Sequence, residues 1–222
     1  AYEISACLVG SEMCIRDRSI DLKALNLQRT ALILCDLQND FLHPEGAYGR
    51  SGVTSPEISL VPGRMVSVCD AMRNAGCPIV STHFTLVSGR NGEPLISDHL
   101  RVVRPFLKKG DFQSGGWGHD LFDLLKPVDE KIEKVAFSAF YMSRLEWYLR
   151  KINVDTLIFS GIVTNGGVAS TLRDAHVRDF STILLADGCA AFDIHTHDTA
   201  IKALEPVTTI TTCEELISGI AK

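Results

Sequence analysis

The segment from Ser160 to Phe180 constrains the fold of this chain more than any other. An apolar run, Thr156 to Ser160, predicts a buried strand, and a turn flanked by glycines follows it. A helix is then expected from about Gly166 to Arg178. The first backbone amides of a helix lack partners within the helix and carry partial positive charge. This strand, turn and helix unit is therefore typical of α/β folds that hold an electron-rich group beyond a strand's carboxyl end.

Strands and helices alternate along the rest of the chain. Further strands are predicted at 30–36, 78–82, 131–137, 182–187 and 207–210, and further helices at 62–75, 143–150, 196–204 and 214–221. Alternation of this kind favours a parallel sheet covered on both faces. We therefore expect an α/β fold with three αβα layers around a six-stranded, mainly parallel, Rossmann-like sheet.

Composition limits the functions that this chain can have. With 222 residues, 45% of them apolar and 22% charged, residues 19–222 are expected to form one globular domain. The net charge is −5 and basic residues do not cluster, so neither nucleic acid nor a membrane is an expected partner. The seven cysteines show no CxxC pairing, which favours reduced thiols and a cytoplasmic location.

The first eighteen residues do not fit the pattern of the rest. They lack the basic start, long apolar centre and cleavage site of a signal peptide. The stretch from Cys7 to Arg18 resembles the translation of a sequencing adapter, so residues 1–18 are interpreted as a non-native tail. A genuine but disordered tail is the alternative.

Asp36 and Lys134 are the first candidates for chemistry. Asp36 ends an apolar strand, where a carboxylate costs stability unless it is paired or used. Lys134 lies in a later predicted strand beside Val135 and needs a counter-charge if it points inward. The alternatives are a turn aspartate and an edge lysine in water. We predict that the two form an ion pair at the carboxyl edge of the sheet, facing Gly166 and Gly167.

Other polar motifs carry weaker signals. The turn from Gly161 to Gly166 has phosphate-loop spacing but lacks the Lys and Ser or Thr that should follow it. Asp193, His195 and His197 suggest a metal, yet a solvated helix start is the favoured interpretation because residues two apart on a helix face apart. Cys35 alternates away from Asp36 and is expected in the core.

The long segment from His83 to Gly118 is rich in glycine. Such a loop inside a compact domain is often a lid or a binding loop. We expect it to cover the site and to supply Trp117, although simple packing of that ring is the alternative. His83 is a candidate pocket donor or, equally, a structural histidine.

Three segments together resemble the isochorismatase-like cysteine hydrolase superfamily: Ala31–Phe41, Glu133–Phe140 and Gly161–Thr171 with Arg173–Ala175. The resemblance carries the family's Asp and Lys onto Asp36 and Lys134, and it places Gly167 where the family has its nucleophilic cysteine. It also implies a non-prolyl cis peptide bond at Val163–Thr164, no zinc, no cofactor and a homo-oligomer, either a dimer or a tetramer.

From the residues and the resemblance we predict the site. Its catalytic positions are Asp36, Lys134 and Gly167, and its substrate-binding residues are Gln38, Phe41, His83, Trp117, Thr164, Asn165, Gly166 and Val168. The amides from Gly166 to Val168 are expected to form a cluster of donors for developing negative charge.

The resemblance points to two substrate classes. True isochorismatases, which cleave a vinyl ether, resemble this chain in having glycine at the position of the cysteine. Thr164, Asn165 and the Arg173–Ala175 region look more like amidases for ureido and carbamoyl compounds. The favoured interpretation is a hydrolase of a small polar metabolite that works without the usual cysteine. The alternatives are a catalytically silent binding protein and a relocated thiol.

Overall fold

The computed structural model describes residues 20–221. The interpretation of residues 1–18 as a tail lies outside the described residues. Within residues 20–221, helices with both the length and the apolar character needed to cross a bilayer are absent.

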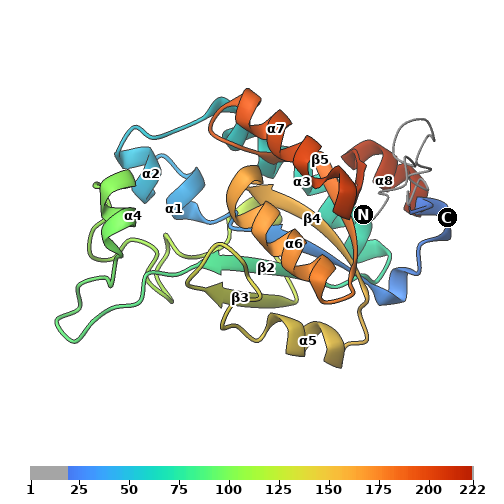
Figure 1. The fold of residues 1–222 in the computed structure, drawn as a ribbon, viewed down its shortest axis with the longest axis horizontal. Coiled ribbons are helices and arrows are strands. Elements are labelled where there is room, and N and C mark those ends of the chain that lie inside the picture. The colour runs from blue at the N-terminus through green and yellow to red at the C-terminus, as the bar shows by residue number, and fades with distance from the viewer. Residues whose placement is uncertain (1–19, 222) are drawn as a thin grey trace, which may run out of the picture.

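A single six-stranded sheet forms the centre of the described chain (Figure 1). Its strand order is β3-β2-β1-β4-β5-β6, and every neighbouring pair is parallel. The strands are β1 Thr30–Cys35, β2 Ile79–Phe84, β3 Glu130–Lys134, β4 Thr156–Ile162, β5 Ser181–Ala190 and β6 Thr209–Thr211. The predicted three-layer α/β fold is thus confirmed, with a sheet that is parallel throughout.

Helices cover both faces of this sheet. The α-helices are α1 Asn39–Leu42, α2 Ala47–Arg50, α3 Pro56–Asn74, α4 Asp98–Val103, α5 Leu145–Lys151, α6 Ala169–Val177, α7 Ile194–Leu204 and α8 Cys213–Ile220. Short 3-10 turns lie at Leu22–Ala24, Leu27–Arg29, Asp123–Leu125 and Glu205–Val207, and a wider π-type turn at Thr164–Val168 precedes α6.

Strand β1 shows why the central apolar run is continuous. Leu32 and Leu34 face the cluster formed with α3 and α8, whereas Ala31 and Ile33 face the cluster formed with α5 and α6. All six residues of β1 are buried. A parallel strand covered on both faces must be apolar at every position, so the run has no alternation.

A third apolar cluster lies apart from these two layers. It contains Ala47, Tyr48, Leu86, Leu107 and Phe112, which come from α2 and from the segment between β2 and β3. In Figure 1 the arrowheads of β2, β3 and β4 point toward α1, α2 and α4. The cluster therefore belongs to the part of the chain that covers the carboxyl edge of the sheet.

Element boundaries differ from the predictions where proline or buried polar residues decide them. The helix expected from Pro62 begins at Pro56, which takes the first helical position, and Pro62 is tolerated inside α3. Strand β3 ends at Lys134 instead of continuing to Phe137, because Lys134 turns into the interior and donates to the carbonyls that follow it.

Candidate functional site

Asp36 and Lys134 meet at the carboxyl edge of the sheet, where β1 and β3 end. Lys134 Nζ lies 2.7 Å from Asp36 Oδ2, and the two side chains are 2% and 7% exposed respectively. Asp36 leaves β1 with φ 56°, a left-handed conformation that aspartate tolerates better than most residues. The ion pair predicted from the sequence is therefore present and buried.

Further polar contacts satisfy this pair. Lys134 Nζ donates to the carbonyls of Ala136 at 3.0 Å and Phe137 at 3.1 Å, and Thr82 Oγ1 donates to Asp36 Oδ1 at 2.9 Å. A buried ion pair is tolerated only when such bonds offset its lost hydration. Thr82 was not predicted as a site residue. Its signal in the sequence is its position near the end of β2, where it pairs in register with Cys35.

Burial is the largest influence on the Asp36 carboxyl. Desolvation raises the pKa of Asp36, while Lys134 and the hydrogen bond from Thr82 lower it, and the net shift is upward. Burial likewise raises the pKa of the neighbouring Cys35 thiol, which faces the core as predicted. Cys35 is therefore an inert thiol, whereas Asp36 can exchange a proton closer to neutral pH than an ordinary aspartate.

Gly167 faces the ion pair directly. A Cβ atom built on Gly167 would lie 2.9 Å from Asp36 Oδ2, 3.3 Å from the Ile162 carbonyl and 3.6 Å from Lys134 Nζ. Gly167 does not adopt a positive φ, so its backbone is one that other residues can take. The position predicted to correspond to the cysteine is thus adjacent to both charged groups.

The turn that carries Gly167 differs in two details from the predictions. The cis peptide bond is Ile162–Val163, one residue earlier than expected, directly where β4 ends. The amides of Gly166 and Val168 both donate to the Val163 carbonyl, at 2.9 and 3.3 Å. Because the wide turn uses these donors internally, the predicted donor cluster is not open at these two positions.

The remaining residues of this turn have separate environments. Thr164 is buried, and its Oγ1 lies 2.8 Å from Nδ1 of His197 on α7. Asn165 is exposed. His197 was predicted to belong to a solvated helix start, yet its ring also contacts the turn through Thr164. Asp193 does cap α7, with its Oδ1 accepting from the Thr196 amide at 2.8 Å.

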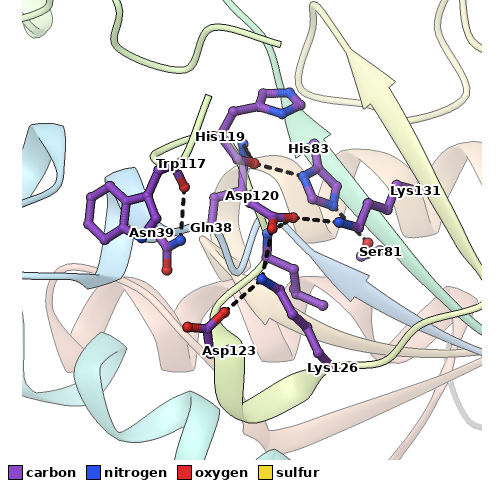
Figure 2. Close-up of polar contacts among 11 residues, drawn as sticks. Gln38, Asn39, Ser81, His83, Trp117, His119, Asp120, Asp123, Lys126 and Lys131 are labelled. Atoms are coloured by element: carbon purple, nitrogen blue, oxygen red, sulfur yellow. Dashed lines mark hydrogen bonds and ion pairs between the residues drawn. The ribbon is translucent and has the colours of Figure 1, made fainter. Parts of the chain in front are cut away.

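Gln38 and His83 form part of a polar network (Figure 2). The Gln38 amide donates to the carbonyls of Phe84 and His119 at 3.0 and 2.9 Å and accepts from the Phe84 amide at 2.7 Å. The His83 ring lies 2.7 Å from Ser81 Oγ and 2.8 Å from the His119 carbonyl. Both ring nitrogens of His83 thus have hydrogen-bond partners within the protein, which favours the structural alternative for His83.

Trp117 borders a cavity away from the ion pair. The cavity has a volume of about 710 Å³, lies beside β3, and is lined in part by His83, Trp117, Lys131, Glu133 and Arg144. Asp36, Lys134 and Gly167 are not among its lining residues. Trp117 is 51% exposed and stacks edge-on against His43, while its carbonyl accepts from Asn39 (Figure 2). The structure therefore does not bring Trp117 to the ion pair.

The segment between β2 and β3 does cover the carboxyl edge, through another aromatic group. Phe41 packs against Phe112, with ring centroids 4.5 Å apart, and against Tyr48 at 4.8 Å. Asp40 holds this arrangement, because its carboxylate accepts from the amides of Ala47 and Phe112 at 2.9 and 2.6 Å. The covering predicted for residues 83–118 thus comes from Phe112 and α4.

Among residues 20–221, groups of three or more His, Cys, Asp or Glu side chains placed to hold a metal ion do not occur. All five cysteines in this range, Cys35, Cys69, Cys77, Cys189 and Cys213, are free and buried.

The parallel α/β fold carries a buried Asp–Lys pair at the carboxyl edge of its sheet, and comparison with known proteins identifies the family. Residues 30–215 match the isochorismatase domain. The chain is 34% identical over 175 residues to the ureidoacrylate amidohydrolase RutB of Methylobacterium radiotolerans, covering 74% of this chain and 68% of that protein. It is 31% identical over 169 residues to RutB of Pseudomonas savastanoi, covering 71% and 69%.

Solved structures show the same fold. The cysteine hydrolase from Pseudomonas syringae pv. phaseolicola superposes with a TM-score of 0.76 and 24% identity, covering 88% of this chain and 94% of that one. The N-carbamoylsarcosine amidase from Thermoplasma acidophilum gives a TM-score of 0.66 and 23% identity, covering 84% and 97%. The chain belongs to the isochorismatase family. The ureidoacrylate amidohydrolase relatives confirm the predicted hydrolase class.

Proposed function

We propose that this protein hydrolyses an amide or ureide C–N bond of a small polar metabolite, using Asp36 and Lys134 and no cysteine nucleophile. The observation that carries the proposal is the buried ion pair, 2.7 Å between Lys134 Nζ and Asp36 Oδ2, which faces Gly167. Matches to ureidoacrylate amidohydrolases and the fold of an N-carbamoylsarcosine amidase support the substrate class.

Water would replace the thiol as the nucleophile. The oxygen of the water bonds to the acyl carbon of the substrate while Asp36 accepts a proton from the water. The carbonyl oxygen of the substrate becomes negatively charged in this step. When the C–N bond breaks, the carbonyl reforms and Asp36 returns the proton to the departing nitrogen. Lys134 stabilises the Asp36 carboxylate before attack and the developing negative charge during it, which a buried cation does effectively.

The state of the Asp36 proton determines whether this chemistry can run. Burial raises the pKa of Asp36 and Lys134 lowers it, so the two effects oppose each other. A base must be deprotonated in the resting enzyme and still take a proton in the transition state, which favours a pKa closer to neutral. The net upward shift supports this role.

Ammonia release from ureidoacrylate and from related ureides by purified protein tests the proposal. We expect Asp36→Asn to lose at least about 100-fold in kcat, since general acid–base catalysis contributes about 10²–10⁴-fold. Asp70→Asn on the exposed face of α3 is the matched control and should keep parental activity. Melting curves show whether each variant is folded. Full activity in folded Asp36→Asn contradicts the proposal.

A second candidate function is cleavage of a vinyl ether, with Asp36 as the acid that protonates the substrate. The upward pKa shift of Asp36 and the glycine at position 167 favour it. The pH profile separates the two: activity that needs deprotonated Asp36 rises with pH through its pKa, whereas activity that needs the acid falls. Binding of a ligand without turnover of any substrate would instead identify a silent binding protein.

Two predictions stay untested. The homo-oligomer, a dimer or a tetramer, rests on the family resemblance, and the cytoplasmic location rests on the thiol content. Light scattering on the purified protein measures the first directly.

A further inference from the structure

Thr82 contacts Asp36 through its main chain and through its side chain. Its carbonyl accepts from the Asp36 amide at 3.0 Å, and its Oγ1 donates to Asp36 Oδ1 at 2.9 Å. Thr82 lies near the end of β2 and is fully buried. Asp36 follows β1 in a left-handed conformation. Thr82 therefore fixes the main chain of Asp36 and one oxygen of its carboxylate at the same time.

The Thr82 hydroxyl occupies a position where an apolar side chain would also fit. Val80, two residues earlier and on the same face of β2, belongs to the apolar cluster formed with α5 and α6. Cys35 and Ile132, which pair in register with Thr82 on β1 and β3, belong to the same cluster. A buried hydroxyl costs free energy unless it forms a hydrogen bond. Its acceptor here is Asp36 Oδ1, so the hydroxyl serves the carboxylate and not the packing.

Lys134 holds the other oxygen of Asp36 and has no donor left. Its Nζ lies 2.7 Å from Asp36 Oδ2 and donates to the carbonyls of Ala136 and Phe137 at 3.0 and 3.1 Å. An ammonium group has three N–H donors, so all three are used. Lys134 cannot turn to Oδ1 without breaking one of these bonds. Within residues 20–221, Thr82 is the donor that Oδ1 has.

The two oxygens of Asp36 thus have different surroundings. Oδ1 is bound by Thr82, whereas Oδ2 lies 2.9 Å from the Cβ position that is empty at Gly167. A carboxylate oxygen has about two lone pairs, so Oδ2 keeps one besides the bond from Lys134. The terminal torsion of an aspartate is broad. The orientation of the carboxylate therefore depends on a donor at each oxygen, Thr82 on one side and Lys134 on the other.

We propose that Thr82 is a positioning residue, which holds Oδ1 and so makes Oδ2 the oxygen of Asp36 that transfers the proton. This inference rests on the proposed function, because that function assigns the acid–base step to Asp36. The proton passes from the attacking water to Oδ2 and from Oδ2 to the departing nitrogen. Oδ1 keeps its bond from Thr82 throughout, so the carboxyl group stays in place between the uptake of the proton and its return.

Two substitutions separate the hydroxyl from the shape of the side chain. Thr82→Val keeps the shape and removes the hydroxyl, whereas Thr82→Ser keeps the hydroxyl. We expect Thr82→Val to lower kcat for ureide hydrolysis by about 10- to 100-fold at pH 7, with KM within about twofold of the parent, because a misplaced catalytic group loses about that much. The acid limb of the kcat profile should move up by about 1–2 pH units, since the ionised carboxylate loses a donor. Thr82→Ser should keep the parental limb and most of kcat.

A second measurement does not need turnover. The carboxyl carbons of ¹³C-labelled aspartates are followed by NMR as the pH is changed, and the signal of Asp36 is the one missing in Asp36→Asn. Its midpoint should rise in Thr82→Val and stay at the parental value in Thr82→Ser. Burial raises the pKa of the two other titratable neighbours, Cys35 on β1 and Tyr48 on α2, so neither titrates in this acid range.

Thr30→Val is the matched control. Thr30 is also fully buried, and its hydroxyl donates to the Asn26 carbonyl at 2.8 Å, at the opposite end of β1 from Asp36. This variant should lose stability without a change in the pH limb or the carboxyl midpoint. Melting curves show which variants are folded, and Thr82→Ala gives a second variant without the hydroxyl should Thr82→Val not fold. A parental limb and a parental midpoint in the folded variant overturn the inference, as does a Thr82→Ser protein that behaves like Thr82→Val.

The two proposals fail in different ways. Full activity in folded Asp36→Asn removes the proposed function and with it the catalytic part of this inference, while the NMR midpoint still reports whether Thr82 governs the Asp36 proton. Loss of activity in Asp36→Asn, together with an unchanged limb and midpoint in Thr82→Val, removes the role of Thr82 alone.

Discussion

Replacing Gly167 with cysteine tests the site most directly. The new Cβ would lie 2.9 Å from Asp36 Oδ2, so this carboxylate oxygen must move by a few tenths of an ångström. Overpacking of that kind costs about 1–3 kcal/mol, and replacing a glycine within a helical turn recovers about 0.5–1 kcal/mol. The net cost of about 0–2.5 kcal/mol predicts a Tm lower by at most about 10 °C, with the protein still folded.

The reactivity of the introduced thiol can be estimated from its neighbours. Lys134 Nζ lies 3.6 Å from the Cβ position and the start of α6 follows, and both favour a thiolate. The native thiols of Cys69 and Cys77 are the internal standard, because burial raises their pKa to about 11. A thiol with a pKa of about 7 would be half ionised at pH 7, against roughly one in 10⁴ for these two. Its alkylation should therefore be faster on the order of a thousandfold.

Iodoacetamide labelling followed by peptide mapping between pH 5 and 9 measures this, with the parent as the control. Ammonia release from amides, ureides and carbamoyl compounds is measured in parallel. The expected result is labelling of residue 167 well below the pH of a free thiol, together with increased amidase activity. A folded Gly167→Cys protein whose new thiol reacts only like a free cysteine, and which gains no activity, refutes the argument that the environment of a nucleophile persists here.

Three further predictions concern stability and are measured by urea unfolding. Gly161→Ala should destabilise by at least about 3 kcal/mol, because Gly161 has φ 122° and an added Cβ would lie 2.1 Å from the Cys35 carbonyl; an unchanged midpoint contradicts this. Asp40→Asn should cost about 2–3 kcal/mol, since an amide cannot accept from both Ala47 and Phe112; a loss under 0.5 kcal/mol counts against it. Burial lowers the pKa of His83 to about 4, so near pH 6.5 His83 becomes protonated in the unfolded chain but stays neutral in the folded protein. The free energy of unfolding should therefore fall by about 2 kcal/mol from pH 7 to pH 5. His83→Gln should remove this part of the pH dependence of stability.

The sheet could be predicted because each strand leaves a local signal. A strand buried on both faces must be apolar throughout, and β1, β4 and β5 carry such runs. The parallel arrangement follows from the helices between strands, and it brings Asp36 and Lys134 to one edge. Asp36 and Lys134 are far apart in the sequence but lie in contact as predicted, because the order and direction of the strands place both at the carboxyl edge of the sheet.

The rest of the site depends on contacts that the sequence does not specify. Gly166 and Val168 donate within the turn because it is wide, and propensity does not reveal its width. Trp117 looked like a lid residue from its glycine neighbours, but the Asn39 side chain binds its carbonyl away from the pair. The orientation of a loop side chain is set by tertiary contacts. A glycine-rich composition therefore predicts a binding loop but does not predict which part of the protein that loop covers.

Two aspartates after β1 show what separates a structural carboxylate from a reactive one. Asp36 and Asp40 are both buried, and in the sequence both follow the same apolar run. Asp40 uses both oxygens to hold the main chain of Ala47 and Phe112, so a proton on it would break the fold locally. Asp36 is held by the side chains of Thr82 and Lys134, and its Oδ2 also faces the Cβ position that glycine leaves empty. A carboxylate that binds side chains and borders such a gap can change its proton without unfolding the loop, which is what an acid or a base requires.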